Sequence, residues 1–223
     1  MANKSKNKKN VDRVVIRFTG DSGDGMQLTG SRFTEATAIM GNDLATFPDY
    51  PAEIRAPAGS LAGVSSFQIQ FSSDNIGTPG DKLDVLVAMN PAALKTNLAD
   101  LKTSGIIIAN KANYTDKNLK LSGWELNPLE DDSLRDYRVI ALDMTRLVSN
   151  AVEDMDLSIK LISRSTNMFA LGLVSWMYDR TLDPTINFIK NKFAKRPELV
   201  EANIRALKAG YNMVTQSKNF SIL

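Results

Sequence analysis

A strand, a glycine-rich turn and a helix follow one another near the start of the chain, and this order constrains the fold more than any other feature. Residues 14–18 (Val-Val-Ile-Arg-Phe) are mostly β-branched or aromatic, as is typical of a strand. Gly20, Gly23 and Gly25 then interrupt the pattern, and apolar side chains recur at helical spacing over 26–40. Such a turn presents backbone N–H groups and a helix N-terminus, which together suit an anionic ligand.

Two known ligand signatures that begin in a similar way match this loop poorly. A dinucleotide fingerprint requires the order G-x-G-x-x-G, whereas Gly20, Gly23 and Gly25 give G-x-x-G-x-G. Asp21 and Asp24 would also repel a pyrophosphate, and both are more typical of turn formation than of catalysis. Gly23-Asp24-Gly25 opens like a thiamine diphosphate motif, but no asparagine follows at the usual distance. The loop alone favours a purely structural turn.

The chain contains neither cysteine nor histidine, and this excludes several kinds of site. Thiolate-ligated iron–sulfur clusters, the usual zinc sites, cysteine nucleophiles and serine–histidine triads all require one of these residues. We therefore expect no catalytic residue and no metal site in this chain, and any electron transfer would take place on another polypeptide. The lack of cysteine agrees with a cytoplasmic protein.

A single domain fits 223 residues with 43% hydrophobic content. No apolar run approaches the roughly 18 residues of a membrane span. Residues 1–10 carry four lysines, so we expect a disordered lysine-rich tail there; without these charges the net charge falls from +2 to about −2, which indicates no nucleic-acid surface. The domain is expected over 11–215, and 216–223 would be a tail or the start of a linker.

The middle of the chain predicts further strands and a capped helix. Residues 65–71 alternate strictly between apolar and polar side chains, which predicts a half-exposed strand, at a sheet edge or antiparallel to its neighbours. Residues 84–89 and 106–109 are continuous apolar runs, typical of strands covered on both faces. Between them, Asn90-Pro91 would begin a helix whose apolar spacing continues to Leu101, and this completes a βαβ unit.

The remaining elements follow the same alternation. Residues 114–136 are polar and predict an irregular connection or short surface strands. The other expected elements are a strand over 137–142, helices over 145–155 and 168–178, and two last helices that begin near Pro184 and Pro197. The predicted fold is therefore α/β, a Rossmann-like, mostly parallel sheet flanked by helices, with an added half-exposed strand.

A long proline-containing segment over 46–65 is the second candidate functional feature. Prolines at 48, 51 and 57 exclude a regular helix or a central strand, and a loop of this length in a compact domain is usually functional. Within it, the guanidinium of Arg55 could bind a phosphate or a carboxylate through two hydrogen bonds. The simpler interpretation is an arginine that is solvated or paired locally with Glu53.

Together, the first loop and this segment resemble the gamma domain of the 2-oxoacid:ferredoxin oxidoreductases, most closely the form fused at the N-terminus of the alpha subunit in 2-oxoglutarate-type enzymes. The resemblance spans roughly residues 12–215 and is carried by 20–25, by Glu53-Ile54-Arg55-Ala56 and by Asn167-Met168 with Leu171-Gly172. Many relatives carry Gly-Gln-Gly at 23–25 and Arg-Gly-Gly at 55–57, where this chain has Gly-Asp-Gly and Arg-Ala-Pro.

The resemblance implies one component of an enzyme that oxidatively decarboxylates a 2-oxoacid, 2-oxoglutarate in the closest form, joins the acyl group to coenzyme A and reduces ferredoxin. Thiamine diphosphate, Mg and the iron–sulfur clusters would lie on partner alpha and beta domains or subunits, so the chain alone would be inactive. Its own part would be to enclose the active site and to contact coenzyme A. The expected cofactor-binding residues are Gly20, Asp21, Ser22, Gly23, Asp24, Gly25, Glu53 and Arg55.

Two other functions stay open. The chain could be a stand-alone Rossmann-like module that binds a free nucleotide, or an architectural subunit without chemistry of its own. The favoured interpretation makes one geometric demand: residues 20–25 and 46–60 should lie together over the carboxyl ends of the parallel strands.

Overall fold

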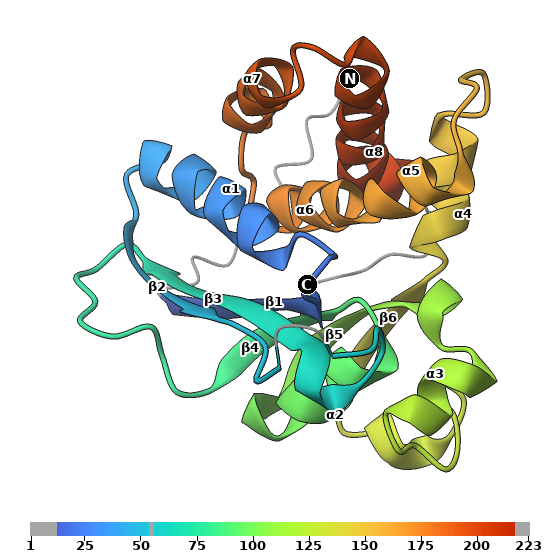
Figure 1. Ribbon diagram of the computed structural model, residues 1–223. Coiled ribbons are helices and arrows are strands. Elements are labelled where there is room, and N and C mark those ends of the chain that lie inside the picture. The colour runs from blue at the N-terminus through green and yellow to red at the C-terminus, as the bar shows by residue number, and fades with distance from the viewer. Residues whose placement is uncertain (1–12, 54–55, 217–223) are drawn as a thin grey trace, which may run out of the picture.

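A six-stranded sheet forms the centre of the computed structural model, which describes residues 13–53 and 56–216 (Figure 1). Strands β1, β4, β5 and β6 run parallel, whereas β3 is antiparallel to both β1 and β2. The α/β fold with a mostly parallel sheet is therefore confirmed. In sheet order, the strands are β2 (Asp43–Asp49), β3 (Val64–Ser72), β1 (Arg13–Asp21), β4 (Leu83–Ala88), β5 (Leu101–Asn110) and β6 (Arg138–Leu142).

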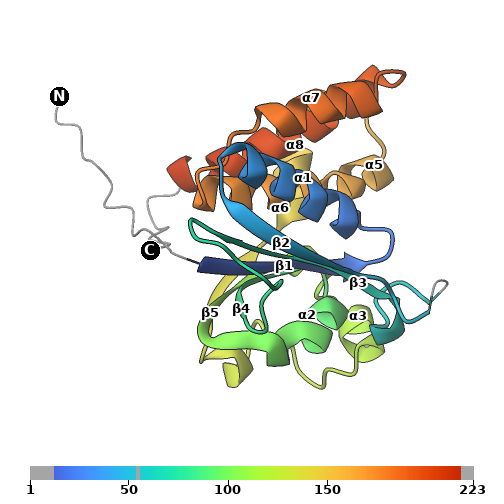
Figure 2. The same ribbon diagram turned by 90° about the vertical axis from the view of Figure 1, so that its left-hand side faces the viewer.

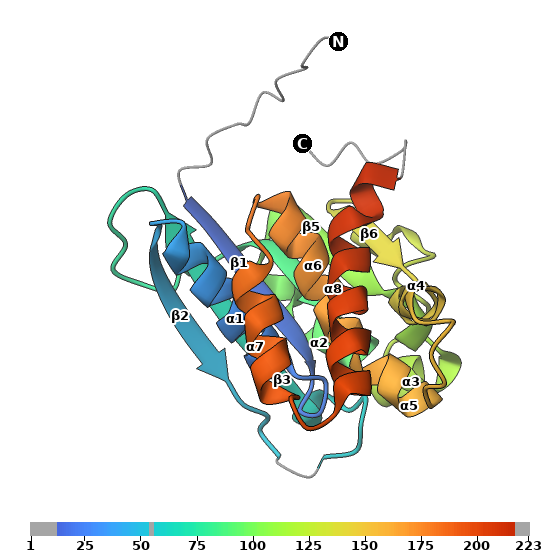
Figure 3. The ribbon, with the colours of Figure 1, turned by 90° about the horizontal axis from the view of Figure 1, so that it is seen from above.

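Helices cover both faces of this sheet. Helices α1 and α6 lie on one face with α7 and α8 outside them, and α2 and α3 lie on the other face (Figures 2 and 3). Among the described residues, no helix combines the length and the apolar character needed to cross a membrane. The helices are α1 (Met26–Ile39), α2 (Pro91–Asn97), α3 (Asp116–Leu121), α4 (Met144–Ala151), α5 (Ile159–Arg164), α6 (Thr166–Met177), α7 (Asp183–Lys192) and α8 (Pro197–Gln216).

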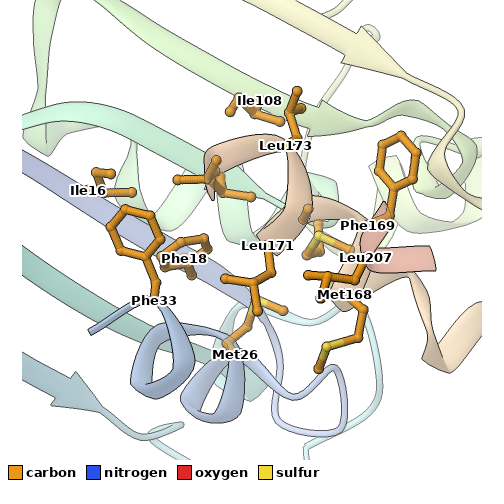
Figure 4. Packing of buried hydrophobic residues seen from close by; sticks show 14 of the residues in the cluster. Ile16, Phe18, Met26, Phe33, Ile108, Met168, Phe169, Leu171, Leu173 and Leu207 are labelled. Atoms are coloured by element: carbon orange, nitrogen blue, oxygen red, sulfur yellow. The ribbon is translucent and has the colours of Figure 1, made fainter. Parts of the chain in front are cut away.

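The core has two parts because the central strands bury both faces. Ile16 and Phe18 of β1 pack with α1 and α6 in the larger cluster, and Figure 4 shows Met26, Phe33 and Leu171 converging on the same region. The alternate residue of β1, Val15, belongs to the second cluster, which lies under α2. Removing this apolar surface from water is the main source of stability, at about 25 cal/mol per Å².

Strand β3 corrects one expectation. Every residue of Val64–Ser72 is buried, and β3 lies inside the sheet rather than at its edge. Of the two arrangements expected for it, the antiparallel one is right. The polar side of β3 is covered by the segment 73–82, because Gln68 Nε2 donates to the carbonyls of Pro79 (2.8 Å) and Gly80 (2.6 Å) and its Oε1 accepts from Arg17. The sequence pattern does not distinguish a buried glutamine whose amide is fully hydrogen-bonded from a glutamine that faces water.

The capped helix is shorter than expected. Asn90 Oδ1 accepts from the amide of Ala93 at 2.8 Å and Pro91 opens α2 as predicted, but the helix ends at Asn97. A 3₁₀ turn follows, and Leu101 is already the first residue of β5. The spacing of Leu94, Leu98 and Leu101 reflects burial on a common side rather than one continuous helix.

Other expectations are confirmed with small differences. The strand near 137–142 and the last two helices are present, and α6 is buried along most of its length. The segment 114–136 contains α3 and 3₁₀ turns instead of surface strands. Three of its apolar side chains join the second cluster: Tyr114, Leu119 and Leu134. The expected tail over 1–10, and 217–223 of the expected tail or linker, lie outside the described residues.

Candidate functional site

The candidate site lies at the carboxyl ends of β1 and β4. From β1 the chain passes through α1 toward β2, and from β4 it passes through α2 on the opposite face toward β5 (Figure 2). The two connections therefore leave in opposite directions, so the topology of the sheet changes direction between the ends of β1 and β4. Open α/β sheets usually bind their ligands at such a point.

Asp21, the last residue of β1, holds the two candidate segments together. Its Oδ2 accepts a hydrogen bond from the amide of Gly59 at 2.9 Å. One residue further on, the amide of Ser22 donates to the carbonyl of Gly63 at 3.1 Å. The predicted neighbourhood of 20–25 and 46–60 is thus confirmed.

Asn90 joins the same carboxylate from the β4 side. Its Nδ2 donates to Asp21 Oδ1 at 2.9 Å, while its Oδ1 caps α2. Both oxygens of Asp21 are therefore occupied. Burial raises the pKa of Asp21, and the hydrogen bonds from Gly59 and Asn90 oppose that effect by stabilising the charged form.

A small cavity of about 100 Å³ lies between the two segments. Sites that enclose a cofactor usually measure roughly 300–1,000 Å³, so this one can receive only part of such a molecule. Asp21 and the exposed Glu53 supply carboxylates, and apolar side chains supply most of the remaining wall. The lining residues are Asp21, Ser22, Gly23, Glu53, Ala56, Pro57, Ala58 and Gly63.

Asp24 turns back toward β1 instead of lining the cavity. Its Oδ2 accepts from the amide of Asp21 at 2.9 Å and would lie only 2.8 Å from a Cβ at Gly20, so Gly20 leaves room for this carboxylate. Burial raises the pKa of Asp24 to about 6, and the charge of Asp21 acts in the same direction. The hydrogen bond from Asp21 only partly offsets these effects.

The loop amides divide into two groups. Those of Asp21, Ser22 and Asp24 donate within the protein. Among the described residues, the amides of Gly23 and Gly25 have no such acceptor. Gly25 precedes α1 with φ of 76°, a left-handed conformation, and neither a side-chain cap nor an acidic residue occupies the first turn of the helix. Donors to an anion are therefore concentrated at Gly23, Gly25 and the start of α1.

The expected site residues thus separate in space. Asp21, Ser22, Gly23 and Glu53 line the cavity, whereas the expected site residues Gly20, Asp24 and Gly25 do not. Arg55 lies outside the described residues. In the part of the chain that the structure describes, no group of three or more acidic side chains is arranged to hold a metal ion.

Two contributors were missed in the sequence. Asn90-Pro91 is recognisable as a helix cap, but nothing near it in sequence indicates its bond to Asp21, 69 residues away. Gly59 has φ of 82°, a conformation that favours glycine, and its position two residues after Pro57 was the signal available for a turn. Its partner could not be inferred from local pattern.

Comparison with known proteins gives a consistent result. A family described as pyruvate ferredoxin/flavodoxin oxidoreductase matches residues 15–213. The 2-oxoglutarate oxidoreductase subunit KorA of Mycobacterium tuberculosis is 58% identical over 202 residues, which are 91% of this chain and 31% of that protein.

Solved structures agree with the sequence comparison. The 2-oxoglutarate:ferredoxin oxidoreductase of Magnetococcus marinus, solved with 2-oxoglutarate, coenzyme A and succinyl-CoA, superimposes with a TM-score of 0.67 and 25% identity, over 94% of this chain and 32% of that one. The keto/oxoacid ferredoxin oxidoreductase gamma subunit of Geobacter sulfurreducens shares the fold, with a TM-score of 0.61 and 19% identity, over 92% of this chain and 99% of that one. The chain spans about one third of the length of the Mycobacterium and Magnetococcus proteins.

Proposed function

The chain belongs to the pyruvate ferredoxin/flavodoxin oxidoreductase family, and from this membership we propose that it is the gamma-type domain of a coenzyme A-acylating 2-oxoacid:ferredoxin oxidoreductase. The proposed substrate of the complete enzyme is 2-oxoglutarate, because the 58% identical relative is named for that substrate. Such an enzyme would work in the cytoplasm, in keeping with a chain that uses no disulfides.

The observation that carries the proposal is the shallow cavity that Asp21 lines at the carboxyl end of β1, beside the end of β4. It lies where α/β sheets bind ligands, yet it is too small to enclose a cofactor. A surface of this kind fits a domain that covers one side of a site whose remaining walls belong to other polypeptides. In the proposed complex, those polypeptides carry thiamine diphosphate and Mg, and also the iron–sulfur clusters, for which this chain has no cysteine ligand.

The residues present fit coenzyme A in two different ways. The free amides of Gly23 and Gly25, with the start of α1, would hold a phosphate group. The exposed carboxylate of Glu53 suits N–H and O–H donors instead, so the cavity would take an uncharged, amide-bearing part of the coenzyme. When bound, coenzyme A supplies the thiol that accepts the acyl group. In this proposal Arg55 contributes a further phosphate contact.

The test is a turnover assay of the assembled enzyme. With the partner polypeptides present, the complex should reduce ferredoxin in a reaction that needs both coenzyme A and a 2-oxoacid, with 2-oxoglutarate preferred over pyruvate and 2-oxoisovalerate. The chain alone should show no turnover. Turnover by the chain alone, or by the partners without it at an unchanged rate and unchanged KM for coenzyme A, would overturn the proposal.

The nucleotide-binding alternative is separated by a thermal-shift series on the chain with NAD, FAD, ATP and coenzyme A. A marked stabilisation by coenzyme A alone supports the gamma-type function. Stabilisation by one of the other nucleotides would favour the stand-alone module. An architectural subunit predicts no shift with any of the four.

A further inference from the structure

Gly25 and Asn167 meet at the start of α1, although they are far apart in sequence. Asn167 is the second residue of α6, and its Nδ2 would lie 2.5 Å from a Cβ placed on Gly25. A Cβ at this position would therefore force the carboxamide of Asn167 to move. The carboxamide of Asn167 therefore borders the turn that ends in the helix N-terminus of α1.

The orientation of this carboxamide is unfavourable within the protein. Asn167 is only 7% exposed, and its Oδ1 is buried without a hydrogen-bond partner. Nδ2, not Oδ1, is the atom that faces Gly25. Because the first-turn amides of a helix are donors, the oxygen would be the better atom to point at them. The observed orientation adds a further donor to a place that already has several.

Asp24 does not neutralise this cluster of donors. Its Oδ2 bonds to the amide of Asp21 and lies beside Gly20, on the β1 side of the turn. The first turn of α1 carries no acidic residue, and Gly25 offers no capping side chain. The helix dipole and the free amides therefore remain available to an external anion.

We propose that the start of α1 and Asn167 form a phosphate-binding site in which Asn167 Nδ2 donates to a phosphate oxygen beside the amides of Gly25 and the first helical turn. This inference rests on the proposed function, since the phosphate would be that of the coenzyme, and it adds α6 to the binding surface. Asn167 is a binding residue in this scheme and takes no part in the chemistry.

The test uses inorganic pyrophosphate and the full 223-residue chain. In the ¹⁵N spectrum, pyrophosphate should shift the backbone signals of Gly23 and Gly25 and the side-chain NH₂ signal of Asn167. Calorimetry should show Asn167→Asp weakening pyrophosphate binding at least about tenfold, because the change removes the donor and adds a like charge. Asn167→Ser, which keeps a hydroxyl donor, should bind better than Asn167→Ala.

The matched control is Asn203→Asp on α8. Asn203 is also 7% exposed, but its Nδ2 donates to the carbonyl of Leu199 within the same helix, so this variant should bind pyrophosphate like the wild type. Equal affinity of wild type and Asn167→Asp, an unmoved Asn167 NH₂ signal, or no binding by the wild type would each overturn the inference.

Coenzyme A then separates the two proposals. If pyrophosphate binding depends on Asn167 but coenzyme A does not displace the pyrophosphate, the result supports this phosphate site and contradicts the proposed function. If Asn167→Asp and the wild type have equal affinity for coenzyme A, the result is compatible with the proposed function and contradicts the inference. Loss of coenzyme A affinity in Asn167→Asp, with none in Asn203→Asp, supports both.

Discussion

Asn90 donates a hydrogen bond to the carboxylate of Asp21 at 2.9 Å and so joins the ends of β1 and β4. The same side chain caps α2 through its oxygen. One amide thus fixes the position of the carboxylate that also binds the amide of Gly59. Through Asp21, this bond connects the end of β4 to the proline-containing segment, which the end of β1 also contacts through the bond from Ser22 to Gly63.

Replacing Asn90 with alanine should lower the free energy of unfolding by about 2–4 kcal/mol. About 1 kcal/mol comes from the lost cap, and the remainder from a carboxylate oxygen of Asp21 left without its donor. Asn90→Asp separates the two effects, because it keeps the capping oxygen but faces Asp21 with a second carboxylate. In urea denaturation at pH 7, Asn90→Asp should have a lower midpoint than the wild type. Equal midpoints would show that the bond to Asp21 adds nothing.

Asp24 should make the protein less stable as the pH rises. Its pKa in the folded state is about 6, above the ordinary 3.8, so the folded state holds the proton more tightly than the unfolded state does. Stability from this group is complete below the ordinary pKa of 3.8 and is lost as the pH rises through about 6. An asparagine at this position would avoid that loss, while its oxygen could still accept from the amide of Asp21. Asp24→Asn should therefore exceed the wild type by on the order of 2–3 kcal/mol at pH 7.

The measurement for Asp24 is urea denaturation of both proteins between pH 3.5 and 8. The difference should shrink to near zero at the acid end. Asp81→Asn, which removes an exposed carboxylate from a loop, is the control for the change in net charge. A difference in unfolding free energy that stays constant across this pH range would contradict the raised pKa of Asp24.

Much of the fold could be predicted because it is encoded at short range. The turn after β1, the cap of α2 and the glycine at which α1 meets the sheet are all local patterns; a Cβ on Gly30 would overlap the ring of Phe67. The exposure of β3 could not be predicted in this way. Alternation shows which residues are polar, but the partners of Gln68 lie in a segment that folds over it.

The site was predicted less completely than the fold. The resemblance placed 20–25 beside 46–60, and the structure agrees. Three details depend on tertiary contacts that leave no periodic signal: the second bond of Asn90, the direction of the Asp24 carboxylate, and the orphaned oxygen of Asn167. Each involves a polar side chain whose partner, or missing partner, is fixed only by the packed chain.

We expect Gln68 to hold the segment 73–82 against the polar side of β3. Gln68→Leu removes the acceptor of Arg17 and two donors to the carbonyls of Pro79 and Gly80, so a loss of about 2–4 kcal/mol is expected. Gln68→Glu keeps the acceptor but loses the donors. It should leave more of the stability intact while the segment 73–82 becomes open to proteolysis. Limited digestion that is equally slow in wild type and Gln68→Glu would contradict this.

Gly25 and Gly41 provide a matched pair at the two ends of α1. Both have positive φ, 76° and 81°, so alanine at either position costs about 1 kcal/mol of backbone strain. At Gly41 nothing lies within 4 Å of the added Cβ, whereas at Gly25 it would displace the carboxamide of Asn167. Gly25→Ala should therefore lose more stability than Gly41→Ala and should alone weaken pyrophosphate binding. Equal thermal midpoints and equal affinities for the two variants would show that Asn167 moves aside freely, because only the contact with that carboxamide distinguishes the two positions.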